Sequence, residues 1–376
     1  MVAYLDNSAT TFLCENAKKQ MLHSIENCWG NPSSLHQIGI DAEKLLNESR
    51  KTLAKALRCD ADEVIFTSGG TEGNNLAIFG AAYASKRKGN RVITTKIEHP
   101  SVLNAFRRLE QEGFEVIYIG TDKLGHLDMK ELEDAVNENT VLVSVMAVNN
   151  EVGTVQPVEE IAKTVRRKNA PALIHVDAVQ AFGKLPLNPK KMGIDLMTVS
   201  SHKIHGPKGV GALFVKKGTK LRAVAVGGGQ ERDIRPGTEP MPAIAGFIGA
   251  VSELKTEKSL ERLNTLRNSF VEKLGQIDGV TVNSPADALP YIVNLSLKGL
   301  RSETVLNLLS DMEIYVSSGS ACAKGHKSHV LTAMGLKDDD IDSSLRVSMS
   351  RFTTEEELDY FIEGINRAFK VIMKKR

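Results

Sequence analysis

Three consecutive apolar runs in the sequence each end in polar residues that could do chemistry. Residues 142–148 are followed by Asn149-Asn150-Glu151, residues 173–176 by Asp177 and then Gln180, and residues 196–199 by Ser200-Ser201-His202-Lys203. In an open parallel sheet, ligands bind beyond the carboxyl ends of the strands. The sequence therefore predicts that these amides, carboxylates, hydroxyls and amines gather at one edge of a sheet.

A glycine-rich turn is the candidate for binding a phosphate. The segment Phe66-Thr-Ser-Gly-Gly-Thr71-Glu72 follows an apolar run and opens a segment of helical pattern over residues 73–86. Glycines let the backbone approach an anion, and the free N–H groups at a helix start hold it. Ser200 and His202 are further donors for phosphate oxygens. Because such turns are also common without any anion, a purely structural role stays open.

Asp177 and Lys203 are the two residues that suggest a cofactor ring. A carboxylate directly after Ile174-His-Val is costly to bury without a partner, and a pyridinium N–H is one such partner. Asp177 suits the N-cap of a helix over residues 178–182 equally well. Lys203 lies among glycines and short polar residues, where burial favours the neutral amine that a Schiff base requires, although most lysines are simply solvated.

His99 and Cys322 each have a chemical and a structural interpretation. His99, in Ile97-Glu-His-Pro-Ser101, either stacks on a ring and transfers protons or is a structural residue after a strand. Cys322 lies in a small, polar, glycine-bearing segment that is typical of a loop. On its residues alone it is more simply a buried packing cysteine. If it is reactive, the neighbours Lys324, His326 and Lys327 would lower its pKa.

The elements that carry these residues follow from hydrophobic periodicity. Short apolar runs alternate with longer segments of helical period, which indicates an α/β fold with a largely parallel sheet. The predicted strands are residues 64–67, 91–94, 115–119, 141–148, 172–176, 196–199 and 212–215. Further on we expect an amphipathic segment over 241–276, strands near 280–282 and 291–296, and helices near 303–312 and 355–373. Thr354 and the three glutamates after it predict the start of the last helix.

The length of the chain predicts two domains. Its 376 residues exceed what one hydrophobic core usually supports. The strands become weaker and the helical segments longer after about residue 250. We therefore expect a large α/β domain over residues 13–250 and a smaller α+β domain made of residues 1–12 and 251–376.

Composition and charge narrow the class of protein. The chain is 41% apolar and 25% charged, with a net charge of +2, which gives no reason to expect direct binding of nucleic acid or an anionic membrane. Its four cysteines, Cys14, Cys28, Cys59 and Cys322, show no CxxC pairing, which argues against a disulfide framework and a structural metal site. The N-terminal residues do not have the pattern of a secretory signal, and no apolar run is long enough to span a membrane. We therefore expect this protein to function in the reducing cytoplasm.

Taken together, the motifs resemble one family over residues 4–369. They are Tyr4-Leu-Asp-Asn-Ser-Ala-Thr-Thr11, Asn31-Pro-Ser-Ser-Leu-His36, Phe66-Thr-Ser-Gly-Gly-Thr-Glu72, Glu98-His-Pro100, Asn149-Asn-Glu-Val-Gly-Thr154, His175-Val-Asp-Ala-Val-Gln180, Ser201-His-Lys-Ile-His-Gly-Pro-Lys-Gly209, Gly227-Gly-Gly-Gln-Glu-Arg232, Arg235-Pro-Gly-Thr-Glu239, Ser317-Ser-Gly-Ser-Ala-Cys322, Leu345-Arg346 and Ser350-Arg-Phe-Thr-Thr354. In this order they are highly specific. The chain resembles the fold-type-I, aspartate aminotransferase-like pyridoxal-phosphate (PLP) enzymes. Within their class-V aminotransferase family it resembles the group I cysteine desulfurases of the NifS/IscS type.

The resemblance implies roles around the cofactor ring. Lys203 forms the Schiff base with PLP, Asp177 faces the pyridine nitrogen, and His99 stacks on the ring and serves in catalysis. Asn150 and Gln180 contact the ring substituents near the phenolic oxygen, and Asn150 also lies beside the substrate.

The resemblance also implies how phosphate, substrate and sulfur are held. The phosphate ligands are Gly70, Thr71, Ser200 and His202. Thr238 reaches the phosphate of the neighbouring subunit, so the family pattern implies a homodimer. Arg346 receives the substrate carboxylate, a task for which a guanidinium fork is suited. Cys322 is the nucleophile that takes up the sulfur. No resident metal is expected, although Cys322 is a candidate transient ligand of an iron–sulfur cluster.

The implied activity is PLP-dependent removal of sulfur from L-cysteine, which gives L-alanine and a persulfide on Cys322 for a protein acceptor. A class-V aminotransferase or a selenocysteine lyase shares this fold, and a catalytically silent sulfur-relay protein is the alternative of another class. The segment after Cys322 and the end of the chain are shorter than in the best-known members. An iron–sulfur scaffold and a tRNA-thiolation enzyme therefore both stay open as acceptors.

Overall fold

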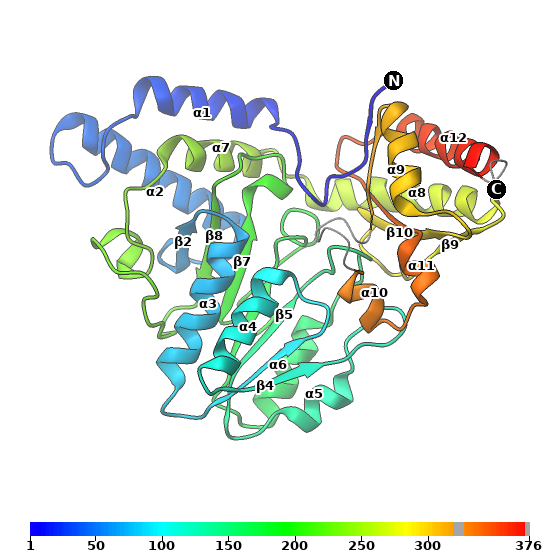
Figure 1. The fold of residues 1–376 in the computed structure, drawn as a ribbon. Coiled ribbons are helices and arrows are strands. Elements are labelled where there is room, and N and C mark those ends of the chain that lie inside the picture. The colour runs from blue at the N-terminus through cyan, green and yellow to red at the C-terminus, as the bar shows by residue number, and fades with distance from the viewer. Residues whose placement is uncertain (319–326, 373–376) are drawn as a thin grey trace.

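The larger part of the molecule is a seven-stranded sheet with helices on both faces (Figure 1). The computed structural model describes residues 1–318 and 327–372. The strand order is β2 (Val64–Thr67), β8 (Gly211–Val215), β7 (Leu196–Ser200), β6 (Leu173–Asp177), β5 (Thr140–Met146), β3 (Arg91–Thr95) and β4 (Glu115–Ile119). Neighbouring strands are parallel except where β8 pairs with β2 and β7. The seven predicted strands and the largely parallel sheet are confirmed, with ends that differ by one or two residues.

Alternate residues of the strands face the two helical layers. Ile65 packs with residues of α3 (Gly70–Ser85) and α4 (Pro100–Gln111), whereas its neighbours Val64 and Phe66 belong to the core on the opposite face. That face carries α2 (Gln37–Leu57), α5 (Met129–Ala135), α6 (Val158–Arg167) and α7 (Met241–Ser252), and α1 (Glu15–Asn27) packs on α7. Burial on both faces explains why these strands are continuous apolar runs in the sequence.

The smaller part contains a four-stranded antiparallel sheet. Its order is β12 (Ser317–Ser318), β13 (Ser344–Ser348), β10 (Ile292–Leu297) and β9 (Val280–Val282), with α8 (Thr256–Gly275), α9 (Ser302–Asp311) and α12 (Glu355–Ile372) beside it (Figure 1). Near the N-terminus, β1 (Ala3–Tyr4) pairs in parallel with β11 (Ile314–Tyr315). The first residues therefore contact this part, and the proposed division into two domains stays a prediction.

Two sequence-based expectations for this part have different outcomes. The amphipathic segment expected over 241–276 is wrong as one element, because α7 ends at Ser252 and α8 begins at Thr256. The predicted start of the last helix is confirmed. The N–H of Glu357 donates to Thr354 Oγ1 at 3.3 Å, and the N–H of Thr354 donates to Glu357 Oε2 at 2.8 Å, which together form a capping box.

Two short helices connect the parts. α10 (His329–Ala333) and α11 (Asp338–Asp342) follow the segment that is not described, and their apolar residues pack on Ile97, Met146 and Val152 of the larger part. The chain thus returns to the carboxyl edge of the large sheet just after residue 326. None of the helices in the described ranges has the length and apolarity needed to span a bilayer.

Candidate active site

Ten predicted site residues meet in one pocket at the carboxyl ends of the central strands. The cavity has a volume of about 510 Å³. Its walls include Gly70, Thr71, His99, Asn150, Asp177, Gln180, Ser200, His202, Lys203 and Arg346. The first nine come from the start of α3 and from the strand ends, turns and loops at the carboxyl edge of the large sheet, whereas Arg346 comes from β13 of the smaller one. The expected gathering of polar residues at one sheet edge is therefore what the fold produces.

Asp177 is a buried carboxylate with two protein donors. It ends β6 and is 6% exposed. Asn74 Nδ2 donates to Oδ2 at 2.8 Å, and the N–H of Val179 donates to Oδ1 at 3.0 Å. Residues 178–182 form turns rather than a helix, so the alternative interpretation of Asp177 as a helix N-cap is wrong. A carboxylate accepts more than two hydrogen bonds, so Asp177 can still accept one from a ligand N–H in the pocket.

The opposite end of the pocket has the properties of an anion site. Helix α3 begins at Gly70, earlier than the expected residue 73, and Gly69 before it has a φ of 145°, which favours glycine. Thr71 therefore lies in the first turn, where free N–H groups point out of the helix. Ser200 Oγ is buried and has no hydrogen-bond partner among residues 1–318 and 327–372. A ligand oxygen would satisfy this hydroxyl.

His202 is a neutral donor at the same end. Burial, helped by the charge of Lys203, lowers the pKa of His202 to about 4. Its Nδ1 lies 3.2 Å from Thr10 Oγ1, which orients the ring. A neutral imidazole carries one N–H, so His202 can donate to an anion without adding a full charge to the pocket.

Lys203 projects from a 3₁₀ turn, Ser201–Lys203, directly after β7. Its Nζ donates to the backbone oxygens of Ser8 and Ala9, the latter at 2.7 Å. These carbonyls belong to the Tyr4–Thr11 motif, so the N-terminal segment forms one wall of the pocket. The amine is partly buried, as the expectation of a reactive lysine requires.

His99 is both a helix cap and a pocket residue. Its Nδ1 accepts the N–H of Ser101 at 3.1 Å at the start of α4, so the neutral ring carries its proton on Nε2. Burial lowers the pKa of His99. The negative charge of Asp177 opposes this shift, and the positive charge of Lys203 adds to it. The ring faces the pocket, where Nε2–H is available for a ligand or a proton transfer.

Arg346 is buried at 8% exposure, and its guanidinium is only partly used by the protein. Nη2 donates to Asp6 Oδ1 at 2.8 Å and to Ser317 Oγ at 3.1 Å, and Nη1 donates to the backbone oxygen of Asn150 at 3.1 Å. Nε is buried and has no partner in the described part of the chain. The alternative of a surface salt bridge is wrong, because the Asp6–Arg346 pair lies in the pocket. The free Nε is an open position for a ligand carboxylate.

Sequence reasoning missed two residues that organise this site. Asn74 holds Asp177 from the second turn of α3, and Asp6 holds Arg346 from the N-terminal segment. Asp6 lies inside a motif that carried the resemblance, and Asn74 is a polar residue on the sheet-facing side of a helix, buried at 1% exposure. Both residues could be noticed in the sequence, but the sequence does not show which residue each of them bonds.

Two predicted residues are not among the described walls of this pocket. Thr238 is exposed in the loop between β8 and α7, away from the pocket of its own chain. Cys322 lies outside the described residues, so its role stays a prediction. No cluster of three metal-binding side chains occurs in the two described ranges.

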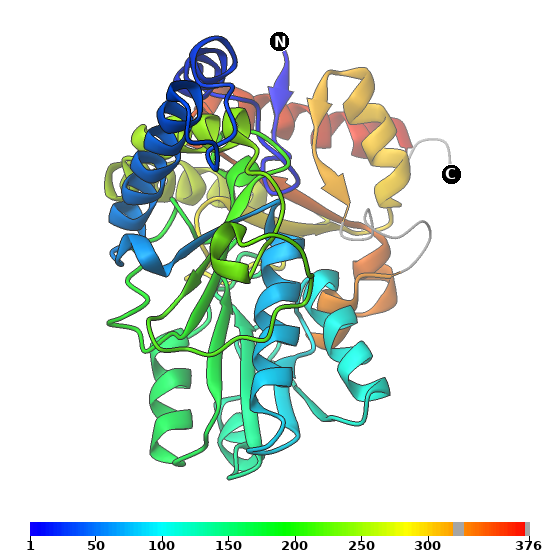
Figure 2. The same cartoon turned by 90° about the vertical axis from the view of Figure 1, so that its left-hand side faces the viewer.

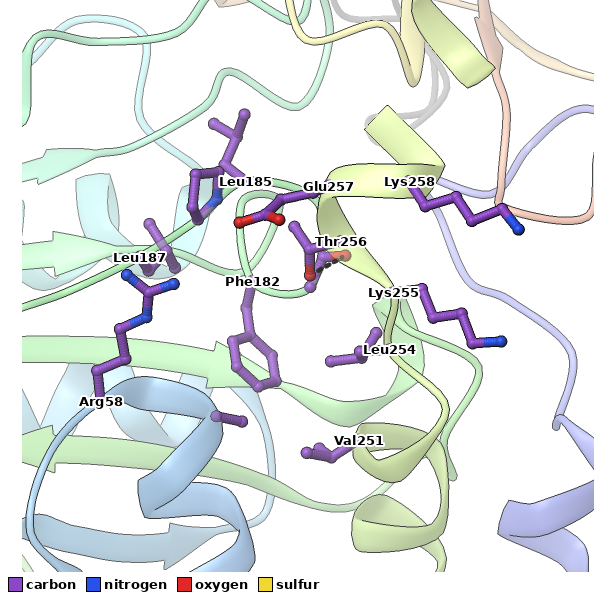
Figure 3. A pocket seen from close by; sticks show the side chains of 13 residues that line it. Arg58, Phe182, Leu185, Leu187, Val251, Leu254, Lys255, Thr256, Glu257 and Lys258 are labelled. Carbon is purple, nitrogen blue, oxygen red and sulfur yellow. Dashed lines mark hydrogen bonds between the residues drawn. The ribbon is translucent and has the colours of Figure 1, made fainter. Parts of the chain in front are cut away.

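A second hollow, of about 450 Å³, lies elsewhere on the molecule (Figure 3). The end of α2, residues 182–187 and the α7–α8 junction surround it, and Phe182, Leu187 and Leu254 give it an apolar wall. Lys255 and Lys258 extend away from Phe182 in Figure 3. None of the predicted site residues lines this hollow, so it is not the candidate active site.

Comparisons with known proteins agree on one family. The family model described as aminotransferase class-V matches residues 3–361. A protein from Clostridium botulinum named cysteine desulfurase IscS is 42% identical over 376 residues, which cover 98% of this chain and 94% of the relative. A solved structure named NifS-like protein superposes with a TM-score of 0.93 at 38% identity and covers 98% of this chain and 100% of its own. Another, SspA in complex with cysteine, has a TM-score of 0.82 at 33% identity, over 94% of this chain and 100% of its own.

Proposed function

This chain belongs to the aminotransferase class-V family and is a cysteine desulfurase, and we propose that it releases sulfur from L-cysteine in the pocket around Lys203, with PLP as cofactor. One observation carries this proposal. A partnered buried carboxylate, Asp177, lies in the same pocket as a lysine amine and the Nε of Arg346, which has no acceptor in the described part of the chain. These are the groups needed for a pyridine nitrogen, a carbonyl and a substrate carboxylate.

The residues present fit PLP at both of its polar ends. The phosphate is suited by the first turn of α3, by the neutral His202 and by the hydroxyl of Ser200, which no described residue bonds. Asp177 suits the pyridine N–H, because Asn74 and Val179 leave one of its acceptor positions open. When bound there, PLP supplies an electron sink for the charge that remains after an amino acid loses its α-proton.

Arg346 supports an α-amino acid as the substrate. Its guanidinium lines the pocket, and its Nε has no acceptor among the described residues, so Nε–H can donate to a carboxylate. The relative SspA was solved in complex with cysteine, and its fold covers 94% of this chain. Asn150 lies beside the same guanidinium, because its backbone oxygen accepts from Arg346 Nη1. We therefore assign the carboxylate of L-cysteine to Arg346, with Asn150 next to it.

The chain's own residues move the protons and the sulfur. Lys203 Nζ takes the α-proton of cysteine. The Cys322 thiolate attacks the substrate sulfur, the carbon–sulfur bond breaks, and a sulfur–sulfur bond forms on Cys322. The electron pair of the broken bond stays with carbon, which takes back the α-proton from Lys203 Nζ and receives, by way of His99, the proton given up by the Cys322 thiol, to become L-alanine. The products, alanine and a persulfide, balance cysteine and the Cys322 thiol.

A homodimer accounts for the position of Thr238 and for the apolar surface near it. Large apolar side chains are exposed on α1, on α2 and in the loop between them, namely Leu22, Ile25, Trp29, Leu35 and Ile38. Val224 and Val226 are exposed in the same loop as Thr238. These segments lie on the side of the molecule that faces the viewer in Figure 2. A second copy on this side would cover the apolar residues and bring Thr238 to the phosphate that this second copy binds.

The sulfur acceptor is a protein with a thiol that attacks the Cys322 persulfide. An iron–sulfur scaffold and a tRNA-thiolation enzyme both meet this requirement. We place the reaction in a reducing compartment such as the cytoplasm, because the cysteine must return to its thiol after each transfer.

Labelled cysteine tests substrate, nucleophile and product in one experiment. The purified protein, incubated with ³⁴S-cysteine, is expected to carry one additional labelled sulfur on the peptide that contains Cys322, as measured by mass spectrometry, and to release alanine. Cys322→Ser should keep the visible absorbance of PLP and lose sulfide release. Cys59→Ser is the control, since burial raises the pKa of that thiol to about 12 and makes it unreactive.

Other outcomes identify the alternatives. Unchanged sulfide release by Cys322→Ser contradicts the role of this cysteine. Amino-group transfer to a keto acid without labelling of Cys322 indicates an aminotransferase. A colourless protein, with no absorbance that borohydride alters, indicates a silent relay protein.

A further inference from the structure

A second lysine is buried beside the cofactor pocket and has no part in the reaction above. Lys184 is 5% exposed and lies in the turns that follow β6. Its Nζ donates to Gln180 Oε1 at 3.0 Å and lies 5.5 Å from the centre of the Tyr291 ring. Within the described residues, no carboxylate forms an ion pair with it. Burying a lysine amine with so little compensation is costly, so this residue calls for a role.

The charges around Lys184 make its burial still less favourable. Lys203 and Arg346 are close enough to repel its charge, and with burial as the main cause they lower the pKa of Lys184 to about 7. Among the described residues that line the small hollow beside Lys184, none is a carboxylate. His202 and His205 are neutral through burial, Tyr291 has a raised pKa, and Arg351 lines the same small hollow.

Lys184 reaches the reactive lysine through one amide. Gln180 is 5% exposed, accepts from Lys184 with its oxygen and donates from Nε2 to the backbone oxygen of Ser8 at 3.0 Å. The same Ser8 oxygen accepts from Lys203 Nζ. Because Lys184 Nζ donates to the amide oxygen, it holds that oxygen on its own side and leaves the amide N–H₂ directed at the wall of the pocket.

We propose that Lys184 is a positioning residue, which fixes the orientation of the Gln180 amide and thereby controls how tightly the cofactor on Lys203 holds its proton. The inference rests on the proposed function, in which Gln180 is near the phenolic oxygen of PLP. An N–H donor at that oxygen withdraws negative charge and weakens its hold on a proton. A reversed amide would present an oxygen there, with the opposite effect.

A pH titration of the visible absorbance of the holoenzyme, without substrate, tests this role. Lys184→Met should raise the midpoint of the absorbance change by about one pH unit, since one hydrogen bond and one nearby positive charge are lost. Lys184→Gln keeps a donor without a charge, so it should restore the midpoint to within about a third of a pH unit. Lys191→Met removes an exposed lysine close by in the sequence and should leave the midpoint unchanged.

The Gln180→Ala background separates the amide from charge acting through space. If Lys184 acts through Gln180, Lys184→Met adds almost nothing to the shift that Gln180→Ala produces. Equal shifts in both backgrounds, or a Lys184→Gln variant that behaves like Lys184→Met, would overturn the proposal. If Lys184→Met does not fold, as judged by circular dichroism, Lys184→Gln with and without Gln180→Ala decides. A wild-type protein without visible absorbance contradicts the proposed function instead.

Discussion

At the scale of single residues, the pocket combines groups that are held by the protein with positions that remain open. Asp177 has two donors and a free acceptor position, and Arg346 has three bonds to the protein and an Nε without an acceptor among residues 1–318 and 327–372. Buried polar atoms without partners are rare in folded proteins and mark places where something binds. Because these protein partners already orient each group, little conformational entropy is lost when a ligand binds.

A substitution of Arg346 tests the carboxylate site. Arg346→Lys keeps the charge but removes the fork, so it should lower kcat/KM for L-cysteine by about 30- to 100-fold, roughly 2–3 kcal/mol. Most of this loss should appear as a higher KM for L-cysteine, measured by alanine release over a range of cysteine concentrations. Arg91→Lys is the matched control, since Arg91 forms a two-bond pair with Glu115 on the sheet edge. An equal loss in both variants would show a general effect on folding.

At the scale of elements, the ends of strands and helices decide what the site contains. The carboxyl ends of β6 and β7 supply Asp177 and Ser200, and the 3₁₀ turn after β7 supplies Lys203. The start of α3 approaches β7 so closely that a Cβ on Gly73 would lie 2.7 Å from Thr198 Cγ2. Small residues at this contact let the helix start come within reach of the phosphate position.

The contribution of the α12 capping box to stability can be tested by substitution. Thr354→Ala removes the acceptor for the Glu357 N–H and should lower the free energy of unfolding by about 1 kcal/mol, measured by urea denaturation. Thr265→Ala serves as the control, because Thr265 is exposed within α8 and caps nothing. Equal stability of the two variants would contradict a stabilising cap.

At the scale of the whole molecule, the site depends on contact between the two parts of the chain. The large sheet supplies most pocket residues, the smaller sheet supplies Arg346, and the N-terminal segment joins them through Asp6. Buried ionisable groups lie at the same junction. The side chain of Glu98 is fully buried, and its Oε1 accepts from Thr95 Oγ1 at 2.8 Å and from the N–H of Met146 at 2.9 Å.

Glu98 predicts a pH dependence of global stability. Burial raises the pKa of Glu98 from 4.5 to about 8, so the folded state holds this proton more tightly than the unfolded state. Stability from Glu98 is therefore full below about pH 4.5 and is lost as the pH rises towards 8, at about 1.4 kcal/mol for each pH unit in this range. Glu98→Gln should match the wild type at pH 5 and exceed its thermal midpoint at pH 9.

The exposed Glu110 provides the control for this measurement. Glu110→Gln, on helix α4, should follow the pH dependence of the wild type. If Glu98→Gln follows it as well, the carboxyl of Glu98 is not held as a neutral acid.

Much of the fold and many site residues could be predicted from the sequence, because their signals are local. Continuous apolar runs marked the strands of the large sheet, and the polar residues after them marked the edge where Asp177 and Lys203 lie. The family motifs added Arg346, which no local pattern distinguishes from other arginines. The break between α7 and α8 was missed, since the hydrophobic pattern continues across it.

Only the tertiary structure decided which groups are partners. Asp6 meets Arg346 across 340 positions of sequence, and Asn74 meets Asp177 across 103. Such pairs depend on the angle and depth at which separate elements pack, and this information is spread over the whole core. The kinds of chemistry available therefore follow from residue types and spacing, whereas the hydrogen-bonding positions left open on each group follow from the folded packing around it.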